Sequence, residues 1–328
     1  VITPKGHLFM IGGFNAHTKE FLNEAYVLDE YRSLLKPLND MFYPRADHVV
    51  HKFKDNIYVL GGMAYRDEKN GGRPYVQSLN TCEFFSITSK KWILLPNFEK
   101  PRQAFSVCQF NEKYIFIIGG KCLNLQARIG DKQQFSFVEE VEAFDIEKNI
   151  WKTINYITDN LKLRIMHAGA IQVTSKKIMI FGGMIESEET DDEENTMIDN
   201  GQVCRLTNQS YYLDVTMGSI KRGPDLNSSS YYINNGGSLL AYENKLFALG
   251  FRVNHEQHQN KAAFSSLAPE DDKKAASSVY LDSLRDAQNI INHKKILHCY
   301  NLADQEFTEI HEGIFTAGAR KQSVDLDD

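Results

Sequence analysis

The chain has 328 residues, of which 42% are hydrophobic and 11% aromatic, and this composition supports a large packed core and excludes global disorder. A net charge of -6 argues against generic nucleic-acid binding. The sequence contains no run of about 18 uncharged apolar residues, so we expect no membrane-spanning segment. The five cysteines show no metal-binding spacing, so we expect a reduced, cytoplasmic protein.

A short apolar strand that ends in two glycines recurs along the chain at intervals of roughly fifty residues. Such a period predicts an array of structural units, each of which buries its hydrophobic face against its neighbours. The glycines also let the backbone turn where a Cβ atom would clash. The four complete copies are Gly12-Gly13, Gly61-Gly62, Gly119-Gly120 and Gly182-Gly183, and a fifth ends as Gly250-Phe251.

Each unit is predicted to contain four short antiparallel strands, bounded by Asn, Asp, Lys or Gly turns. Four-stranded meanders that repeat radially are the blades of a β-propeller. Trp92 and Trp151 fall in the last strand of their units, where we expect them to pack against an adjacent blade. The predicted units are residues 1–43, 44–100, 101–162, 163–228 and 229–314, and residues 315–328 resemble the start of another inner strand.

The pattern of strand, diglycine, aromatic-Asp pair (as in Phe144-Asp145) and tryptophan resembles the kelch repeat over about residues 2–310. This resemblance implies an all-β kelch-type propeller that forms one domain over residues 1–328. Kelch propellers commonly have six blades, so we expect either a six-bladed ring with part outside this chain or a five-bladed closure. Two departures are Ile220 in a tryptophan position and the missing second glycine of unit five.

Long segments of variable sequence follow the diglycines, at residues 63–79, 121–138, 184–208 and 251–294. Strands in a meander alternate in direction, so these segments are expected on one face of the disc. Loops on a rigid scaffold commonly carry binding function. The sequence therefore predicts a recognition face for a protein partner, and tolerated surface insertions are the alternative.

Two of these segments have distinctive composition. The acidic run Glu186–Glu194 is predicted to be a solvated loop or a contact for a basic partner. Residues 280–292 have the apolar spacing of an amphipathic helix, which could pack on its own propeller or dock on another protein.

Arg45, Arg102 and Arg164 lie near the start of successive inner strands, and the kelch resemblance implies positions near the central channel. They are our candidates for the binding face. Two interpretations are open: a hydrogen-bonded brace between blades, and a cluster that recognises carboxylates by bidentate pairing.

Signatures of catalysis and metal binding are weak. The His255–His258 segment has two histidines without a third ligand, and no nucleophile-elbow or phosphate-loop motif is present. We therefore expect no cofactor, no metal and no enzymatic activity. The expected function is that of a protein-interaction scaffold, and the resemblance implies a place in a cytoskeletal or ciliary assembly or another large complex. The alternatives are a kelch-type copper oxidase or sugar mutarotase, and the substrate-recognition domain of a ubiquitin ligase.

Overall fold

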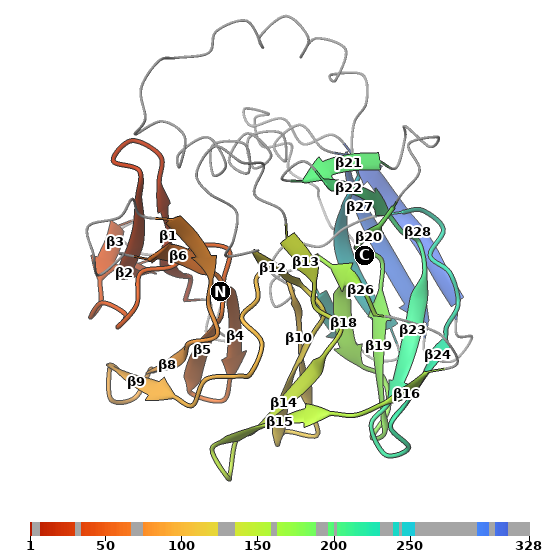
Figure 1. Ribbon diagram of the computed structural model, residues 1–328, viewed down its shortest axis with the longest axis horizontal. Helices are drawn as coiled ribbons and strands as arrows, with labels where there is room; N and C mark the ends of the chain where they lie inside the picture. The colour runs from red at the N-terminus through yellow and green to blue at the C-terminus, as the bar shows by residue number, and fades with distance from the viewer. Residues whose placement is uncertain are drawn as a thin grey trace, which may run out of the picture.

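The computed structural model describes residues 1, 7–29, 34–66, 75–123, 135–158, 163–187, 196–199, 202–229, 239–242, 245–252, 294–301 and 306–313. All regular elements in these residues are β-strands, and they form five blades arranged as a β-propeller (Figure 1). The predicted all-β propeller is therefore confirmed. Within the described ranges no helix is long and apolar enough to cross a membrane.

Each blade is an antiparallel sheet whose strands follow one another in chain order from one edge to the other. Blade 1 contains β1 (Phe9–Asn15), β2 (Glu20–Asp29) and β3 (Leu34–Pro37). Blade 2 contains β4 (Val49–Phe53), β5 (Asn56–Leu60), β8 (Cys82–Ser86) and β9 (Lys91–Leu95). Blade 3 contains β10 (Ser106–Phe110), β11 (Tyr114–Ile118), β14 (Val141–Asp145) and β15 (Ile150–Ile154).

Blade 4 contains β18 (Gly169–Gln172), β19 (Lys177–Phe181), β23 (Ser210–Asp214) and β24 (Ser219–Arg222). A two-residue strand, β16 (Ile157–Thr158), adds to the outer edge of this blade and runs parallel to β24. Blade 5 contains β25 (Leu239–Tyr242), β26 (Lys245–Arg252), β27 (Lys294–Asn301) and β28 (Glu306–Gly313).

The turns between strands have the predicted chemistry. Lys54 and Lys90 adopt the left-handed conformation, with φ of 49° and 56°, in the turns of blade 2. Side chains also accept hydrogen bonds from the turn backbone: Asp145 Oδ1 accepts from the amide of Lys148 at 3.1 Å. Local bonds of this kind help the hairpins to close.

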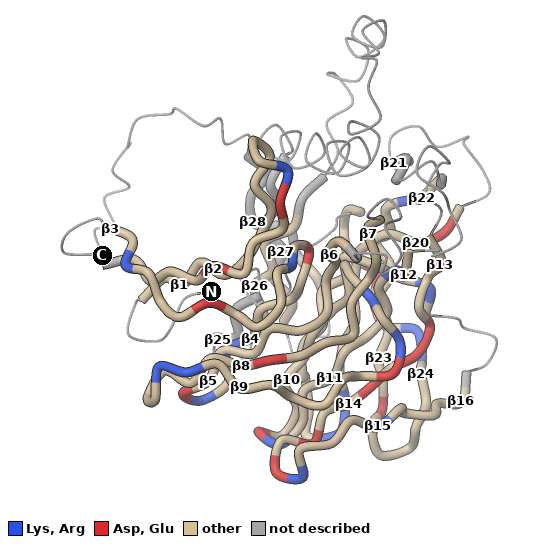
Figure 2. The backbone as a smooth tube through the Cα atoms, turned by 60° about the vertical axis from the view of Figure 1, so that its left-hand side comes forward, with Lys and Arg blue, Asp and Glu red and all other residues tan. Residues whose placement is uncertain are grey.

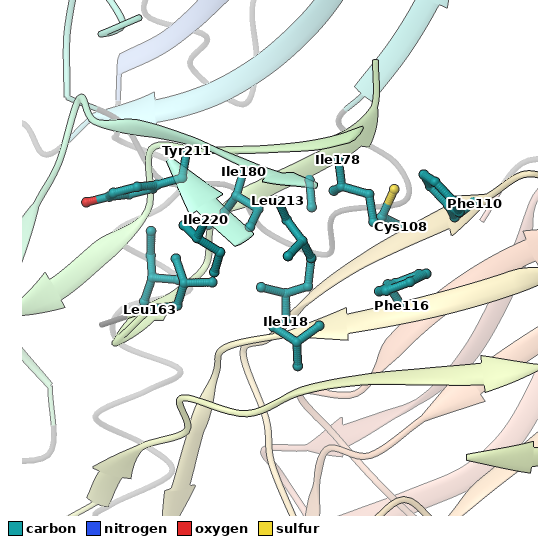
Figure 3. Close-up of a cluster of buried hydrophobic side chains, with 14 of the residues drawn as sticks. Cys108, Phe110, Phe116, Ile118, Leu163, Ile178, Ile180, Tyr211, Leu213 and Ile220 are labelled. Atoms are coloured by element: carbon teal, nitrogen blue, oxygen red, sulfur yellow. The ribbon is translucent and has the colours of Figure 1, made fainter. Parts of the chain in front are cut away.

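The hydrophobic core lies between blades. Four clusters of buried side chains separate successive blades, so a blade buries its faces only against its neighbours. Figure 3 shows the cluster between blades 3 and 4, where the labelled residues are Cys108, Phe110, Phe116, Ile118, Leu163, Ile178, Ile180, Tyr211, Leu213 and Ile220. Full burial of one such side chain contributes about 1.5–3 kcal/mol.

Both tryptophans join neighbouring blades. The indole N–H of Trp92 donates to the Asn39 carbonyl at 2.6 Å, and that of Trp151 donates to the Pro96 carbonyl at 2.8 Å. Each acceptor belongs to the linker that leads from the preceding blade. Ile220 takes this position in blade 4 and is 2% exposed.

The diglycines also join blades. The Gly13 N–H donates to the Arg45 carbonyl at 2.8 Å, and the Gly62 N–H donates to the Arg102 carbonyl at 3.0 Å. A Cβ atom on Gly62 would lie 2.5 Å from the carbonyl oxygen of Ala46, and φ at Gly62 is +94°. Glycine is required here for both reasons, as the sequence predicted.

The segments after the diglycines were predicted as variable loops, but the parts of them that adjoin the blades are β-strands. They begin as β6 (Met63–Arg66) with β7 (Tyr75–Ser78) in blade 2, and β12 (Lys121–Leu123) with β13 (Phe135–Phe137) in blade 3. In blade 4, β17 (Ile165–Met166), β20 (Met184–Glu186), β22 (Gln202–Leu206) and β21 (Thr196–Asp199) form a small sheet. Strands β6, β12, β13, β20, β21 and β22 lie toward the upper side of the molecule in Figure 1, and the β14–β15 turn lies toward the lower side. Figure 2 shows β7 near β6 and β12 on the same upper side.

Several predicted segments lie outside the described residues. They are most of the acidic run after Ser187, the His255–His258 segment, the predicted helix 280–292 and the tail Arg320–Asp328.

Candidate binding face

The strands that follow the diglycines of blades 2, 3 and 4 pack together into one buried cluster, which we call the hairpin platform. Its apolar side chains come from three blades and from β2 of blade 1. The buried members are Phe21, Ala46, Met63, Ala64, Val76, Ala104, Leu123, Phe135, Met166, Met184, Cys204 and Leu206. The sequence did not predict this second core, because its members are scattered over about 190 residues.

Polar contacts also connect neighbouring hairpins. The Leu123 amide donates to Ser78 Oγ at 3.0 Å, which links β12 of blade 3 to β7 of blade 2. The Lys121 amine lies 5.0 Å from the centre of the Phe135 ring, a cation–π distance, although this lysine is only 6% exposed. The platform is therefore a packed surface rather than a set of independent loops.

Arg45 and Arg102 lie inside their blades, and each is 0% exposed. Arg45 donates to the carbonyls of Gly61 and Thr81 at 2.8 and 2.9 Å and to the Glu83 carboxylate at 2.9 Å. Burial lowers the pKa of this guanidinium, and the charge of Glu83 opposes that effect. Arg102 repeats the pattern in blade 3, with Glu142 as its partner at 2.5 Å.

The paired glutamates hold the linkers between blades. Glu83 accepts hydrogen bonds from the amides of Phe42 and Tyr43 at 2.8 and 3.4 Å. Glu142 accepts from the two equivalent amides, those of residues 99 and 100, at 2.7 and 3.3 Å. Each arginine–glutamate pair therefore ties one linker to the second and third strands of its blade. The geometry is that of a brace, and neither arginine has surface with which to meet a partner.

Arg164 does not occupy the equivalent position in blade 4. The Gly120 N–H donates to the carbonyl of Ile165 at 2.8 Å, as Gly62 does to Arg102, so Ile165 is the counterpart of Arg102. Arg164 therefore stands one residue earlier than the sequence comparison implied. Tyr211 takes the place of Glu142, and both Ile165 and Tyr211 are buried in the cluster between blades 3 and 4.

Arg164 is exposed instead, and it bridges two blades through carboxylates. Its Nε donates to Glu139 at 2.5 Å and its Nη1 donates to Glu186 at 2.8 Å. The three side chains are between 36% and 44% exposed. Of the three candidate arginines, Arg164 alone presents its guanidinium at the surface, beside the first residue of the acidic run.

Two histidines and one cysteine of blade 2 are neutral near pH 7. Burial lowers the pKa of His48 to about 3 and that of His51 to about 4. Burial also raises the pKa of Cys82 to about 12, which removes it as a thiolate nucleophile. Across the described ranges, no group of three or more His, Cys, Asp or Glu side chains is arranged to hold a metal ion.

Glu83 and Glu142 are the site residues that sequence reasoning missed. A signal was present, because each glutamate lies in the third strand of a unit whose inner strand begins with Pro-Arg. Unit four lacks both the Pro-Arg pair and the glutamate, so the two features occur together. Pairing them required the strand order of the sheet, which places β8 beside β5.

Comparison with known proteins identifies the repeats. A family model described as the KLHDC2/KLHL20/DRC7 Kelch-repeats domain matches residues 1–183, more than half of the chain. Kelch-like protein 41a of Danio rerio is 26% identical over 186 residues, which cover 55% of this chain and 27% of that protein.

Two other similar proteins have kelch names. Kelch repeat and BTB domain-containing protein 2 of cowpox virus (strain Brighton Red) is 25% identical over 163 residues, or 47% of this chain and 27% of that protein. Kelch-like protein 30 of Homo sapiens is 26% identical over 133 residues, or 40% and 21%. The matched region thus spans about a quarter of the length of these relatives.

Proposed function

This chain belongs to the kelch-repeat family, and on that premise we propose that it is a non-catalytic scaffold or adaptor that binds a protein partner through the hairpin platform. The kelch relatives support a role as a protein-interaction propeller. The observation that supports binding through the hairpin platform is the joint packing of hairpins from three blades on one face. A packed platform loses little conformational entropy when a partner binds.

The platform also offers charges that could select a partner. Arg164 precedes β17 and Arg205 belongs to β22, and both side chains are exposed. Glu186, at the end of β20, lies between them in the sequence and pairs with Arg164. Mixed charges at the edge of an apolar cluster contribute more to specificity and association rate than to affinity. We propose that the protein is cytoplasmic, requires no cofactor, and functions within a larger assembly such as a cytoskeletal or ciliary one.

Charge reversal tests this function. The variant Arg164→Glu/Arg205→Glu changes two exposed side chains beside the platform, and Lys152→Glu on the outer strand β15 is the matched control. Proximity labelling with the intact protein should show a set of partners that the double variant loses and the control keeps. Unchanged thermal stability of the double variant would separate lost binding from unfolding.

Two results would overturn the proposal. If the double variant and the control label the same partners at the same level, the platform is not the binding face. Stoichiometric copper or zinc in the purified protein would favour the enzymatic alternative, and metal analysis measures this directly.

A second candidate is the substrate-recognition domain of a ubiquitin ligase. The names of two similar proteins support it: one contains a BTB domain, and another, from Dictyostelium discoideum, contains a RING finger domain. Under this proposal the platform partner is a substrate. Its ubiquitylation in cells should then fall when Arg164 and Arg205 are reversed, whereas an adaptor without ligase function leaves it unchanged.

A further inference from the structure

The outer rim of blade 2 carries an exposed apolar patch. Phe42, Tyr43 and Leu94 are 55%, 42% and 47% exposed. Phe42 and Tyr43 belong to the linker between β3 and β4, and Leu94 belongs to the outer strand β9. We call these three residues the rim patch. It is separate from the hairpin platform, with which it shares no residue.

The linker of blade 3 shows what the same backbone positions hold elsewhere. The Phe42 amide donates to Glu83 at 2.8 Å, and the Glu99 amide donates to Glu142 at 2.7 Å. Phe42 and Glu99 are therefore equivalent, because each is the first linker residue that the buried glutamate binds. A large aromatic side chain in one blade corresponds to a carboxylate in the next.

The outer strands show the same contrast. Leu94 lies opposite Glu83 in the sheet, and Thr153 lies opposite Glu142, so these two positions are also equivalent. In blade 3 the Thr153 hydroxyl donates to the Glu99 carboxylate at 3.0 Å. From this equivalence we infer that Phe42 lies beside Leu94 in blade 2, and Tyr43 directly follows Phe42 in the linker.

The rim patch is held in one backbone conformation. Both amides of the Phe42-Tyr43 linker are bound by Glu83, which is itself fixed by the buried guanidinium of Arg45. That guanidinium also lies 5.9 Å from the centre of the Tyr43 ring. Pre-ordered aromatic side chains are the usual anchors of protein interfaces, since little entropy is lost when they bind.

The border of the patch toward blade 1 is acidic. The Met41 amide donates to the Asn23 carbonyl at 2.8 Å, which places the linker beside exposed Glu24. Glu24 accepts a hydrogen bond from the Tyr26 hydroxyl at 2.7 Å, and Asp40 acts electrostatically on the same phenol. Two carboxylates therefore lie together on the blade 1 side of the linker that carries Phe42 and Tyr43, and they favour a cationic neighbour.

We propose that the rim patch binds a protein segment in which a bulky apolar side chain is flanked by lysine or arginine. The apolar residue covers Phe42, Tyr43 and Leu94, and the cation pairs with Glu24 and Asp40. The inference rests on the proposed function only in taking the propeller to be a protein-binding domain. It gives the propeller a second docking surface.

A synthetic peptide tests this specificity. The probe is a fluorescein-labelled peptide with a central Leu-Leu flanked on each side by two lysines, and fluorescence anisotropy measures its binding to the full chain. One companion peptide replaces the leucines with alanine, and the other replaces the lysines with glutamate. We expect the parent peptide to bind, and each companion to bind at least about tenfold more weakly.

The variant Phe42→Glu/Leu94→Thr introduces the residues that blade 3 already accommodates at these positions, so the fold should be kept. It should bind the parent peptide at least about tenfold more weakly. Ile93→Thr is the control, because Ile93 is 43% exposed on the same strand but points to its other side.

Three results would overturn the inference: no binding of the parent peptide, equal binding by the rim variant, or binding independent of the leucines and lysines. A concentration-dependent dimer that the rim variant abolishes would identify a second copy of the chain as the occupant instead. Arg164→Glu/Arg205→Glu should leave peptide binding unchanged, so a failure here is distinguishable from a failure of the platform proposal.

Discussion

Blades 2 and 3 differ from blade 4 in how they hold the start of the inner strand. Blades 2 and 3 use a fully buried arginine–glutamate pair, and blade 4 places Ile165 and Tyr211 at the same positions. The backbone hydrogen bond from the preceding diglycine is kept in both cases. The comparison teaches that the propeller requires the backbone contact, and that the ion pair serves to order the linkers of blades 2 and 3.

The largest expected effect comes from leaving one buried charge alone. Glu142→Ala leaves the Arg102 guanidinium buried without a carboxylate, and we expect a loss of about 3–5 kcal/mol in the free energy of unfolding. Chemical denaturation followed by circular dichroism measures it. A loss below about 1 kcal/mol would show that the ion pair of blade 3 is as dispensable as blade 4 suggests.

The packing of the second glycine of each pair can be tested by comparing Gly120 with Gly13. A Cβ atom at Gly120 would lie 2.6 Å from the Gln103 carbonyl oxygen with φ at +96°, whereas Gly13 has φ at +117° and no atom within 4 Å. Both alanine variants carry a backbone cost of about 1–3 kcal/mol, and Gly120→Ala adds a clash. Equal melting temperatures for the two variants would contradict the close packing of Gly120 against the segment that leads into β10 of the same blade.

A double-mutant cycle places the blade 4 residues, isoleucine and tyrosine, at the equivalent positions of blade 3. Glu142→Tyr alone leaves the Arg102 guanidinium buried without its carboxylate partner, and adding Arg102→Ile removes that charge. We expect the double variant to be more stable than the sum of the single changes predicts by about 0.5–3 kcal/mol, as measured by denaturation. Strict additivity would mean that the two positions are not coupled.

Acidification should destabilise the protein through His48 and His51, which lie directly before and in the middle of the inner strand of blade 2. The pKa values of His48 and His51, about 3 and about 4, lie below the ordinary value of 6.5, so below pH 6.5 the unfolded chain binds more protons than the folded chain. Stability is therefore complete above pH 6.5 and falls toward pH 4, by about 1.4 kcal/mol per pH unit for each histidine.

A substitution taken from blade 3 provides the control for this pH dependence. Phe105 faces Gly120 as His48 faces Gly62, so His48→Phe places the blade 3 side chain in blade 2. Denaturation midpoints between pH 7 and pH 4 should then fall about half as steeply. An unchanged slope would assign the pH dependence to other groups.

The smallest effect is expected at Arg164. Its ion pairs with Glu139 and Glu186 are exposed to solvent, so Arg164→Ala should change the free energy of unfolding by about 0–1 kcal/mol. Thermal denaturation at low and high salt measures it. A loss as large as that of Glu142→Ala would mean that the exposed bridge between blades 3 and 4 is also a brace.

Much of the fold could be predicted because its signals are local. The turn residues and the diglycines act through a required backbone conformation, and the two tryptophans stand at the same place in their units. The hairpin platform could not be predicted, since its strands β6, β12 and β20 are only three or four residues long and are stable through contacts with other blades. The register of Arg164 was missed for a related reason: hydrogen bonds between blades, rather than residue type, define equivalent positions.

The sequence by itself determined that this chain is a kelch-type propeller, because glycine spacing and alternating apolar residues act on the backbone directly. Only the tertiary structure decided which charged residues are internal and which are exposed to solvent. Arg45, Arg102 and Arg164 look alike in the sequence, yet two are buried beside glutamates and one is exposed. The physical reason is that burial depends on the residue across the neighbouring strand, which lies about 40 residues away along the chain.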